Sequence, residues 1–258
     1  MKKKFLSAIL SFVLLFTGAT ALTACGNNSD GGSSGGESTP ETEIDDATIF
    51  GTQDSEGLAY ILSKDESYYL VSGLGECKDS KIVIPATYNN RPVLGVAEGN
   101  SQAGAGAFEG CQTLESVVLP DGATTIGAAA FASCRNLLRV SVPDSIEFIE
   151  ETAFRGCSAL VYNEYENGKY LGNKTNPYSV LAGGKNTSVT ACTVHRNAIM
   201  IAAKAFNKHT ALTNVTFEEK VGWTAGGTEI ASADLENATT AASYLTGDYC
   251  AKIWLRSK

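Results

Sequence analysis

Cysteine and histidine are the residues of this chain whose types and spacing could support chemistry. The chain has two histidines, His195 and His209, and Cys192 precedes His195 by three positions. A Cys and a His at short spacing could bind a metal ion or form a nucleophile with its base. On a strand, however, residues three apart point to opposite faces, so these two side chains cannot share a ligand without a bend. We therefore expect His195 in an exposed loop and His209 as a hydrogen-bonded core residue, with no catalytic residue, metal site or cofactor.

Three further cysteines, Cys111, Cys134 and Cys157, recur at an interval of 23 residues, and each follows a phenylalanine by three positions. Six of the seven cysteines follow Cys25, and an even number of cysteines in an exported chain first suggests disulfides. Side chains in equivalent positions of stacked units are parallel, however, and parallel Cβ vectors do not converge as a disulfide requires. We expect three buried free thiols. The other interpretation, a thiol-dependent enzyme or redox protein, requires an exposed thiol of low pKa.

The cysteines belong to a repeat that predicts the fold. The strings AFEGCQTLESVVLPDGATTIG, AFASCRNLLRVSVPDSIEFIE and AFRGCSALVYNEY begin at Ala107, Ala130 and Ala153, so the period is 23 residues. A fixed period of this length is typical of a solenoid, in which each unit buries its apolar face only by stacking on its neighbours. The short apolar alternations in these strings indicate one strand per coil, parallel to the strand of the next coil.

The register extends in both directions from these strings. Upstream, KIVIP at 81–85 reproduces the strand, and downstream VTACTV at 189–194 and NVTF at 214–217 do the same. We therefore expect about five coils within residues 44–217, with an N-terminal cap. The extra residues YNNRPV and GNSQAGAG are expected to loop out. Residues 161–188 should be an insert that interrupts the third coil.

The tail from 218 to 258 departs from the repeat. It is expected to cap the open end of the solenoid with one amphipathic helix and a final strand near 249–255, because an uncovered last coil would expose its apolar edge. A separate functional module in this tail is the alternative.

The repeat resembles the BspA-like leucine-rich repeat family of bacterial surface proteins. The stretches that carry the resemblance are PDGATTIGAAAFASC, from Pro120 to Cys134, and PDSIEFIEETAFRGC, from Pro143 to Cys157. The resemblance extends over roughly residues 57–217 and implies a leucine-rich repeat solenoid, β-rich with short helical turns. It further implies a surface or interaction protein, since some relatives are adhesins for host matrix proteins or other bacteria. A shared scaffold does not by itself identify the ligand.

The N-terminus has the pattern of an export signal. Three lysines at positions 2–4 precede an apolar run at 5–15, and the string LTAC ends at Cys25. This string resembles the lipobox of bacterial lipoproteins, which implies that residues 1–24 are removed and that Cys25 carries a diacylglyceryl anchor. Ordinary secretion is the alternative. Residues 25–43 contain no aromatic residue and are expected to be a flexible tether. The expected location is therefore the outer side of a bacterial membrane, lipid-anchored.

The charge of the chain excludes some partners. The sequence has 20 basic and 28 acidic residues, and removal of the three N-terminal lysines leaves 17 basic residues and a net charge of −11. Nucleic acids and anionic lipid headgroups require clustered Lys and Arg, so we expect no nucleic-acid partner. No later apolar stretch approaches the length of a membrane span, so any membrane attachment should depend on the lipid.

Candidate binding residues come from two regions. If Leu114 and Val117 point inward, the strand positions that point outward include Ser116, Arg139, Tyr162 and Asn214. The insert adds a concentration of tyrosines beside asparagines, a composition found in adaptable recognition surfaces. Its tyrosines are Tyr162, Tyr165, Tyr170 and Tyr178. The alternative is that the insert forms a hairpin, KYL to YSVLA, whose rings only cover the edge of the solenoid.

These observations favour a non-catalytic, surface-exposed lipoprotein that binds a protein or glycan partner. The second interpretation is a structural lipoprotein that scaffolds another component of its own envelope. The thiol-dependent enzyme is the third.

Overall fold

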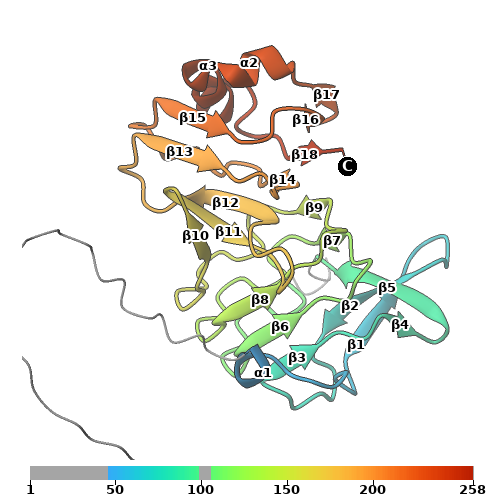
Figure 1. The fold of residues 1–258 in the computed structure, drawn as a ribbon. Coiled ribbons are helices and arrows are strands. Elements are labelled where there is room, and N and C mark those ends of the chain that lie inside the picture. Colours follow the sequence, from blue (N-terminus) through green and yellow to red (C-terminus); the bar gives the residue numbers. More distant parts are fainter. Residues whose placement is uncertain (1–45, 99–105, 258) are drawn as a thin grey trace, which may run out of the picture. The chain divides into compact units, whose positions relative to one another are not determined.

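Short parallel strands, stacked one coil after another, form the framework of the chain (Figure 1). The computed structural model describes residues 46–98 and 106–257, which belong to one compact unit within Glu43–Lys258. The expected signal segment, Cys25 and the tether lie outside the described residues, as does most of the GNSQAGAG stretch.

The first row of strands follows the 23-residue period. One sheet contains β3 (Lys81–Val83), β6 (Ser116–Val118) and β8 (Arg139–Ser141), and a second contains β13 (Ala191–Val194) and β15 (Asn214–Phe217). All neighbours within these sheets are parallel. Val117 pairs with Val140 and Cys192 with Val215, so equivalent positions of successive coils are paired. The expected parallel solenoid is confirmed.

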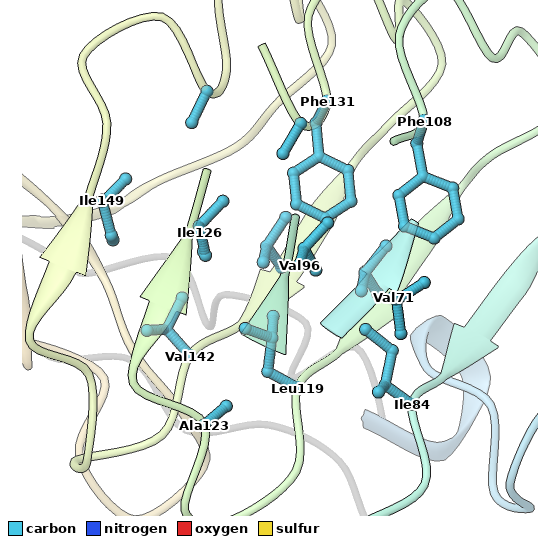
Figure 2. Packing of buried hydrophobic residues seen from close by; sticks show 14 of the residues in the cluster. Val71, Ile84, Val96, Phe108, Leu119, Ala123, Ile126, Phe131, Val142 and Ile149 are labelled. Carbon is cyan, nitrogen blue, oxygen red and sulfur yellow. The ribbon is translucent and has the colours of Figure 1, made fainter. Parts of the chain in front are cut away.

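A second row of strands faces the first across the core. It runs through β5 (Arg91–Val96), β7 (Thr125–Ile126) and β9 (Phe148–Ile149), and further along the chain through β12 (Val180–Gly184) and β14 (Met200–Ile201). Figure 2 shows Val96, Ile126 and Ile149 of this row in line, with Leu119 and Val142 beside them. Each of these five side chains is at most 5% exposed. Aligned apolar positions therefore fill the interior continuously from coil to coil.

Phenylalanines line the third side of the coil. Phe108, Phe131 and Phe154 stack with ring centroids 5.3 and 5.4 Å apart and nearly parallel planes. Figure 2 shows the rings of Phe108 and Phe131 side by side. The shared sequence position of these residues is thus a shared structural position.

The N-terminal part adds antiparallel pairs. Strands β1 (Ala59–Leu62) and β2 (Tyr69–Gly73) pair antiparallel, and β2 continues the second row beside β5. A tight turn with positive φ at Asn89 and Asn90 joins β4 (Thr87–Tyr88) to β5. The stretch YNNRPV was expected to loop out, and this expectation is wrong. Its end begins β5, whose Val96 pairs with Ile126 and supplies the missing strand of that coil.

The insert carries two hairpins. Strand β11 (Gly168–Leu171) pairs antiparallel with β12, which is the expected hairpin of KYL and YSVLA. Strand β10 (Asn163–Tyr165) forms a further hairpin with β11 through Glu166 and Asn167, both with positive φ. Because β12 also pairs parallel with β14, the insert supplies one strand of the solenoid and does not simply interrupt it.

The C-terminal tail covers the last coil. It contains β16 (Trp223–Ala225), β17 (Thr228–Glu229), α2 (Ser232–Glu236), α3 (Ala238–Ser243), the single π-helical turn η1 (Tyr244–Asp248) and β18 (Trp254–Arg256). The one expected helix is divided at Asn237, whose extended backbone ends α2 and whose side chain accepts hydrogen bonds from Thr239 and Thr240 at the start of α3. The expected strand near 249–255 begins only at Trp254.

Strand β18 ends the second row. It lies antiparallel between β14 and β16, so the parallel edge of β14 is paired. Trp223 and Trp254 pack against Phe217, and both indole rings are at most 1% exposed. The tail therefore closes the apolar end that a solenoid otherwise exposes. Within the described ranges, no helix is long and apolar enough to cross a membrane.

A short helix covers part of the outer face of the first row. Helix α1 (Asp46–Ile49) precedes the solenoid, and the Ser116 hydroxyl donates a hydrogen bond of 2.8 Å to the Ile49 carbonyl oxygen. Ser116 is fully buried. The expectation that Ser116 points outward to a ligand is therefore wrong, because the residues before the first strand cover its position.

Candidate functional site

Three of the four predicted tyrosines meet around His195. The ring centroids of Tyr165 and Tyr178 lie 4.6 and 4.4 Å from that of His195 and 5.5 Å from each other. Tyr170 lies 5.5 Å from Tyr178 with nearly perpendicular planes. We call Tyr165, Tyr170, Tyr178 and His195 the aromatic cluster. It joins β10, β11, the segment before β12 and the end of β13.

Tyr170 is the buried member of the aromatic cluster and holds it to the solenoid. It is fully buried. Its hydroxyl donates a hydrogen bond of 2.7 Å to the Thr193 carbonyl oxygen and accepts one of 3.1 Å from the His195 N–H. Burial raises the pKa of Tyr170 far above its ordinary value, so the phenol stays neutral. Tyr170 was expected at a binding surface, and this is corrected: it has no exposed area and positions the other rings.

Charged groups fix the rim of the aromatic cluster. The Tyr165 hydroxyl donates a hydrogen bond of 2.6 Å to Glu218, whose other carboxylate oxygen accepts from the Arg196 backbone N–H at 2.9 Å. The hydrogen bond from Tyr165, followed by that from Arg196, lowers the pKa of the Glu218 carboxyl. Burial lowers the pKa of His195, so its ring is neutral at pH 7. His195 lies in the loop after β13, as expected, but it is packed between two tyrosines and is only partly exposed.

The other predicted binding residues lie outside the aromatic cluster. Tyr162 packs against the main core, where burial raises its pKa, and Lys169 Nζ lies 5.7 Å from its ring centroid. Arg139 Nη1 donates a hydrogen bond of 3.1 Å to the Val161 carbonyl oxygen. Asn214 is exposed on β15. The structure thus does not unite the predicted residues into one surface.

The cysteines of the described segments are all unpaired. Cys134 is fully buried, and its thiol donates a hydrogen bond of 2.9 Å to the Phe108 carbonyl oxygen, while Cys157 donates to Phe131 in the same way. Cys111 and Cys157 are partly exposed, so the expectation of three buried thiols holds only for Cys134. Burial raises the pKa of Cys134 and of Cys192 to about 12. These thiols are protonated at neutral pH and make poor nucleophiles, which disfavours thiol-dependent chemistry at them.

His209 replaces cysteine in the coil of Phe206. Its ring is 8% exposed and packs edge-on to Phe206 at 5.1 Å. Neither ring nitrogen has a hydrogen-bond partner among the described residues, so the expected hydrogen-bonded histidine is wrong. The same part of the chain contains no cluster of three or more Cys, His, Asp or Glu residues that could hold a metal ion.

A cleft that sequence reasoning missed lies between two coils. Its walls come from residues 149–155 and 202–208, and its floor contains Tyr162, Leu171 and Val180. The cleft has a volume of about 400 Å³. Lys204 and Glu151 form an ion pair of 2.7 Å between the walls. We call this cleft, between residues 149–155 and 202–208, the inter-coil cleft. Its sequence signal is the absence of an AFxxC string between Cys157 and Ala205.

Parallel strands in a 23-residue register and a ladder of phenylalanines define a leucine-rich repeat solenoid. The family model for the BspA type Leucine rich repeat region matches residues 96–175 and 185–240 with 6 copies, and the chain belongs to this family. The match counts one more copy than the five coils that we expected, and it ends beyond Phe217, the last residue that we assigned to the repeat.

Solved structures of other bacterial leucine-rich repeat proteins are similar in part. A Treponema pallidum leucine-rich repeat protein is 24% identical, with 64% of this chain and 70% of that chain covered and a TM-score of 0.42. A leucine-rich repeat protein from Bacteroides ovatus is 22% identical, with 64% of this chain and 40% of that chain covered and a TM-score of 0.37. A leucine-rich cell surface protein of Faecalibacterium prausnitzii is 17% identical, with 67% of this chain and 57% of that chain covered and a TM-score of 0.34. The chain thus spans less than two thirds of the latter two. A comparison with curated proteins finds no match.

Proposed function

We propose that the chain is a non-catalytic interaction module of the bacterial cell surface that binds a protein or glycan partner through the aromatic cluster. The observation that carries this proposal is the packing of Tyr165, Tyr178 and His195 around buried Tyr170. Aromatic side chains supply a large contact area at low entropic cost, and rings that are fixed before binding lose little freedom on binding.

The surroundings of the aromatic cluster suit recognition. Tyr165 and Tyr178 are partly exposed, whereas the polar groups of Glu218 and Arg196 line one side. A partly apolar centre with a hydrogen-bonding rim is the usual composition of a protein interface. The family supports a role in interaction, because leucine-rich repeat solenoids present extended surfaces to partners.

A binding screen of the purified full chain against arrays of matrix proteins, glycans and bacterial envelope fractions tests the proposal. Tyr178→Ala should weaken binding of the partner found by about tenfold or more, the cost of losing a central aromatic contact. The matched control is Tyr88→Ala, which removes an exposed tyrosine from the β4–β5 hairpin. Equal effects of the two variants would place the interface elsewhere. Binding only to envelope fractions of the producing cell would favour the scaffolding role.

We further propose that the module is lipid-anchored through Cys25 on the outer side of the membrane. The support is the LTAC string after a lysine-led apolar run. Cys25→Ala should move the protein from the detergent phase to the aqueous phase on phase partitioning, or leave it unprocessed. Unchanged partitioning and unchanged processing would contradict the anchor. Cys250→Ala is the matched control.

A further inference from the structure

The stack of phenylalanine rings ends at the inter-coil cleft. Phe154 packs on Phe131 through one face of its ring, and no further phenylalanine occurs in the chain before Phe206. Within the described residues, no aromatic ring stacks on the other face of Phe154. Phe154 lines the cleft and is partly exposed. The cleft therefore contains a flat apolar surface that the packing of the fold does not use.

Small side chains leave room in front of this ring. The alanines that line the cleft are Ala182, Ala202, Ala203 and Ala205. The volume of about 400 Å³ lies within the usual range of small-molecule sites, roughly 300–1,000 Å³. On the floor, the Tyr162 hydroxyl makes no hydrogen bond with any residue that the structure describes. The space thus combines an aromatic face with a free polar group.

The acidic groups of the cleft already have partners. The Glu150 carboxylate accepts hydrogen bonds from the backbone N–H and the hydroxyl of Thr152. The Glu151 carboxylate forms the ion pair of 2.7 Å with Lys204. Neither carboxylate is therefore left to attract a cationic ligand.

Two basic side chains of the cleft have no such partner. Arg155 and Lys208 line it, and neither side chain forms an ion pair or a hydrogen bond with the described part of the chain. Together with Lys204 they give the cleft three basic residues against two acidic ones, in a chain whose net charge is −8. This local excess of positive charge favours an anionic ligand, and a guanidinium group binds a carboxylate through paired hydrogen bonds.

A carboxylated sugar matches these features together. The C–H groups on one face of a pyranose ring pack against the electron-rich face of an aromatic ring, whereas its hydroxyl groups lie around the edge. The edge of the cleft offers the Tyr162 hydroxyl and the Asn207 amide to such hydroxyl groups. Few polar groups around an apolar surface are the usual composition of a small-molecule site.

We infer that the inter-coil cleft binds a carboxylated saccharide, with a pyranose ring stacked on the free face of Phe154 and the carboxylate held by Arg155 and Lys208. This site is separate from the aromatic cluster. The inference adds a second site to the proposed interaction module and rests on that function only for its biological role.

Other occupants fit less well. An extended peptide strand would need free backbone groups along the walls, but the Ala205 carbonyl oxygen already faces the backbone of Gly183 in β12. Inorganic phosphate would leave the ring of Phe154 uncovered. An aromatic acid would cover the ring but would leave the Tyr162 hydroxyl and the Asn207 amide without a partner.

Isothermal titration calorimetry of the full chain with two pairs of saccharides tests the inference. Sialyllactose is compared with lactose, which lacks the carboxylated sugar, and a galacturonic acid oligomer with its methyl ester, which lacks the charge. At least one acidic saccharide should bind about tenfold more tightly than its neutral counterpart. The two pairs distinguish a terminal sialic acid from a uronic acid chain. Equal affinities within both pairs, or no binding at millimolar concentration, would overturn the inference.

Removal of the two unpaired cations locates the carboxylate. Arg155→Gln combined with Lys208→Gln should weaken binding of the acidic saccharide by about tenfold or more and abolish its advantage over the neutral one. The matched control is Arg135→Gln combined with Lys64→Gln, which removes two exposed cations outside the cleft and changes the net charge equally. Equal losses in the two double variants would reduce the effect to general charge and overturn the assignment.

Replacement of the ring tests the stacking. Phe154→Leu keeps an apolar side chain but removes the flat face, and it should weaken binding of the acidic saccharide about fivefold. Phe148→Leu, at a position that is 44% exposed outside the cleft, should have little effect. Tyr178→Ala should also leave the affinity unchanged. A loss in Tyr178→Ala equal to that in Phe154→Leu would place the saccharide at the aromatic cluster and overturn the inference. A failed partner screen with intact saccharide binding would count only against the proposed function.

Discussion

The rings of Phe131 and Phe154 lie 5.4 Å apart, with planes inclined by 2°. Phe108 continues this stack on the other face of Phe131 at 5.3 Å. The middle ring thus has an aromatic neighbour on both sides, whereas Phe154 has one and borders the inter-coil cleft. Chemically identical residues of the repeat therefore differ in burial, and this difference determines what each contributes to stability.

Truncation of the middle ring should be the most damaging change in the stack. Phe131→Ala leaves a cavity that the rings on either side cannot fill, and we expect a loss of about 3–5 kcal/mol in the free energy of unfolding. Phe154→Ala should cost clearly less, about 2 kcal/mol, because its side chain is only partly buried. Urea denaturation of the full chain measures both values. Equal losses, or a loss below about 1 kcal/mol for Phe131→Ala, would show that the stack does not carry this packing energy.

The thiol of Cys134 should be structural. Cys134→Ala removes a small buried group and its hydrogen bond to Phe108, so we expect a modest loss of about 1 kcal/mol. Cys134→Asp should be much worse, since it would bury a charge that has no partner. Denaturation of the two variants compares these costs.

Mass spectrometry of the alkylated, non-reduced protein is the companion measurement for Cys134. It should find the Cys134 thiol free. A bridge from Cys134 to Cys111 or Cys157 in most molecules would contradict this assignment.

The repeat made most of the fold predictable, because equivalent residues at a constant period must stack if each coil is to bury its apolar face. Phe108 and Phe131 illustrate this, since their spacing in the sequence predicts the contact. Strand β5 was missed because it begins within a turn-like stretch, where Asn89 and Asn90 indicate a loop although the following valines pair in the second row. The 23-residue period alone cannot predict a strand, such as β5, that does not lie at this spacing from its neighbours.

The candidate site was predictable only in part. A concentration of tyrosines marked the insert, but the partner of Tyr165 and Tyr178 is His195, which the sequence places after another strand. The direction of Tyr170 depends on which face of β11 packs on the solenoid, and composition does not give that information. The inter-coil cleft results from a turn that is missing, so no residue type indicates it directly.

The hydroxyl of Tyr170 should stabilise the fold through two hydrogen bonds. Tyr170→Phe preserves the ring but leaves the Thr193 carbonyl oxygen and the His195 N–H without this buried partner. We expect a loss of about 1–3 kcal/mol in the free energy of unfolding. Tyr244→Phe is a suitable control, since its hydroxyl bonds to Asp234 near the surface and should contribute less. Similar losses in urea denaturation would contradict the anchoring role of Tyr170.

His209 should make the stability of the fold depend on pH at values above those at which carboxyl groups titrate. Burial, and more weakly the positive charge of Lys169, lower the pKa of His209 in the folded state below its ordinary value of 6.5. As the pH falls through that value, the unfolded chain binds a proton that the folded chain excludes, so stability decreases with acidification. Above pH 7.5 both states are neutral and the effect vanishes.

His209→Leu removes the titrating group at similar volume, together with two buried nitrogens that lack a hydrogen-bond partner. Between pH 7.5 and 5.5 the variant should lose less stability than the parent chain. A residual slope should remain, since His195 also has a lowered pKa. Cys134→Ala serves as the control, because it lowers stability without changing a group that titrates in this range. Urea denaturation at each pH measures the slopes, and a slope in His209→Leu as steep as in the parent would show that the His209 ring does not titrate differently on folding.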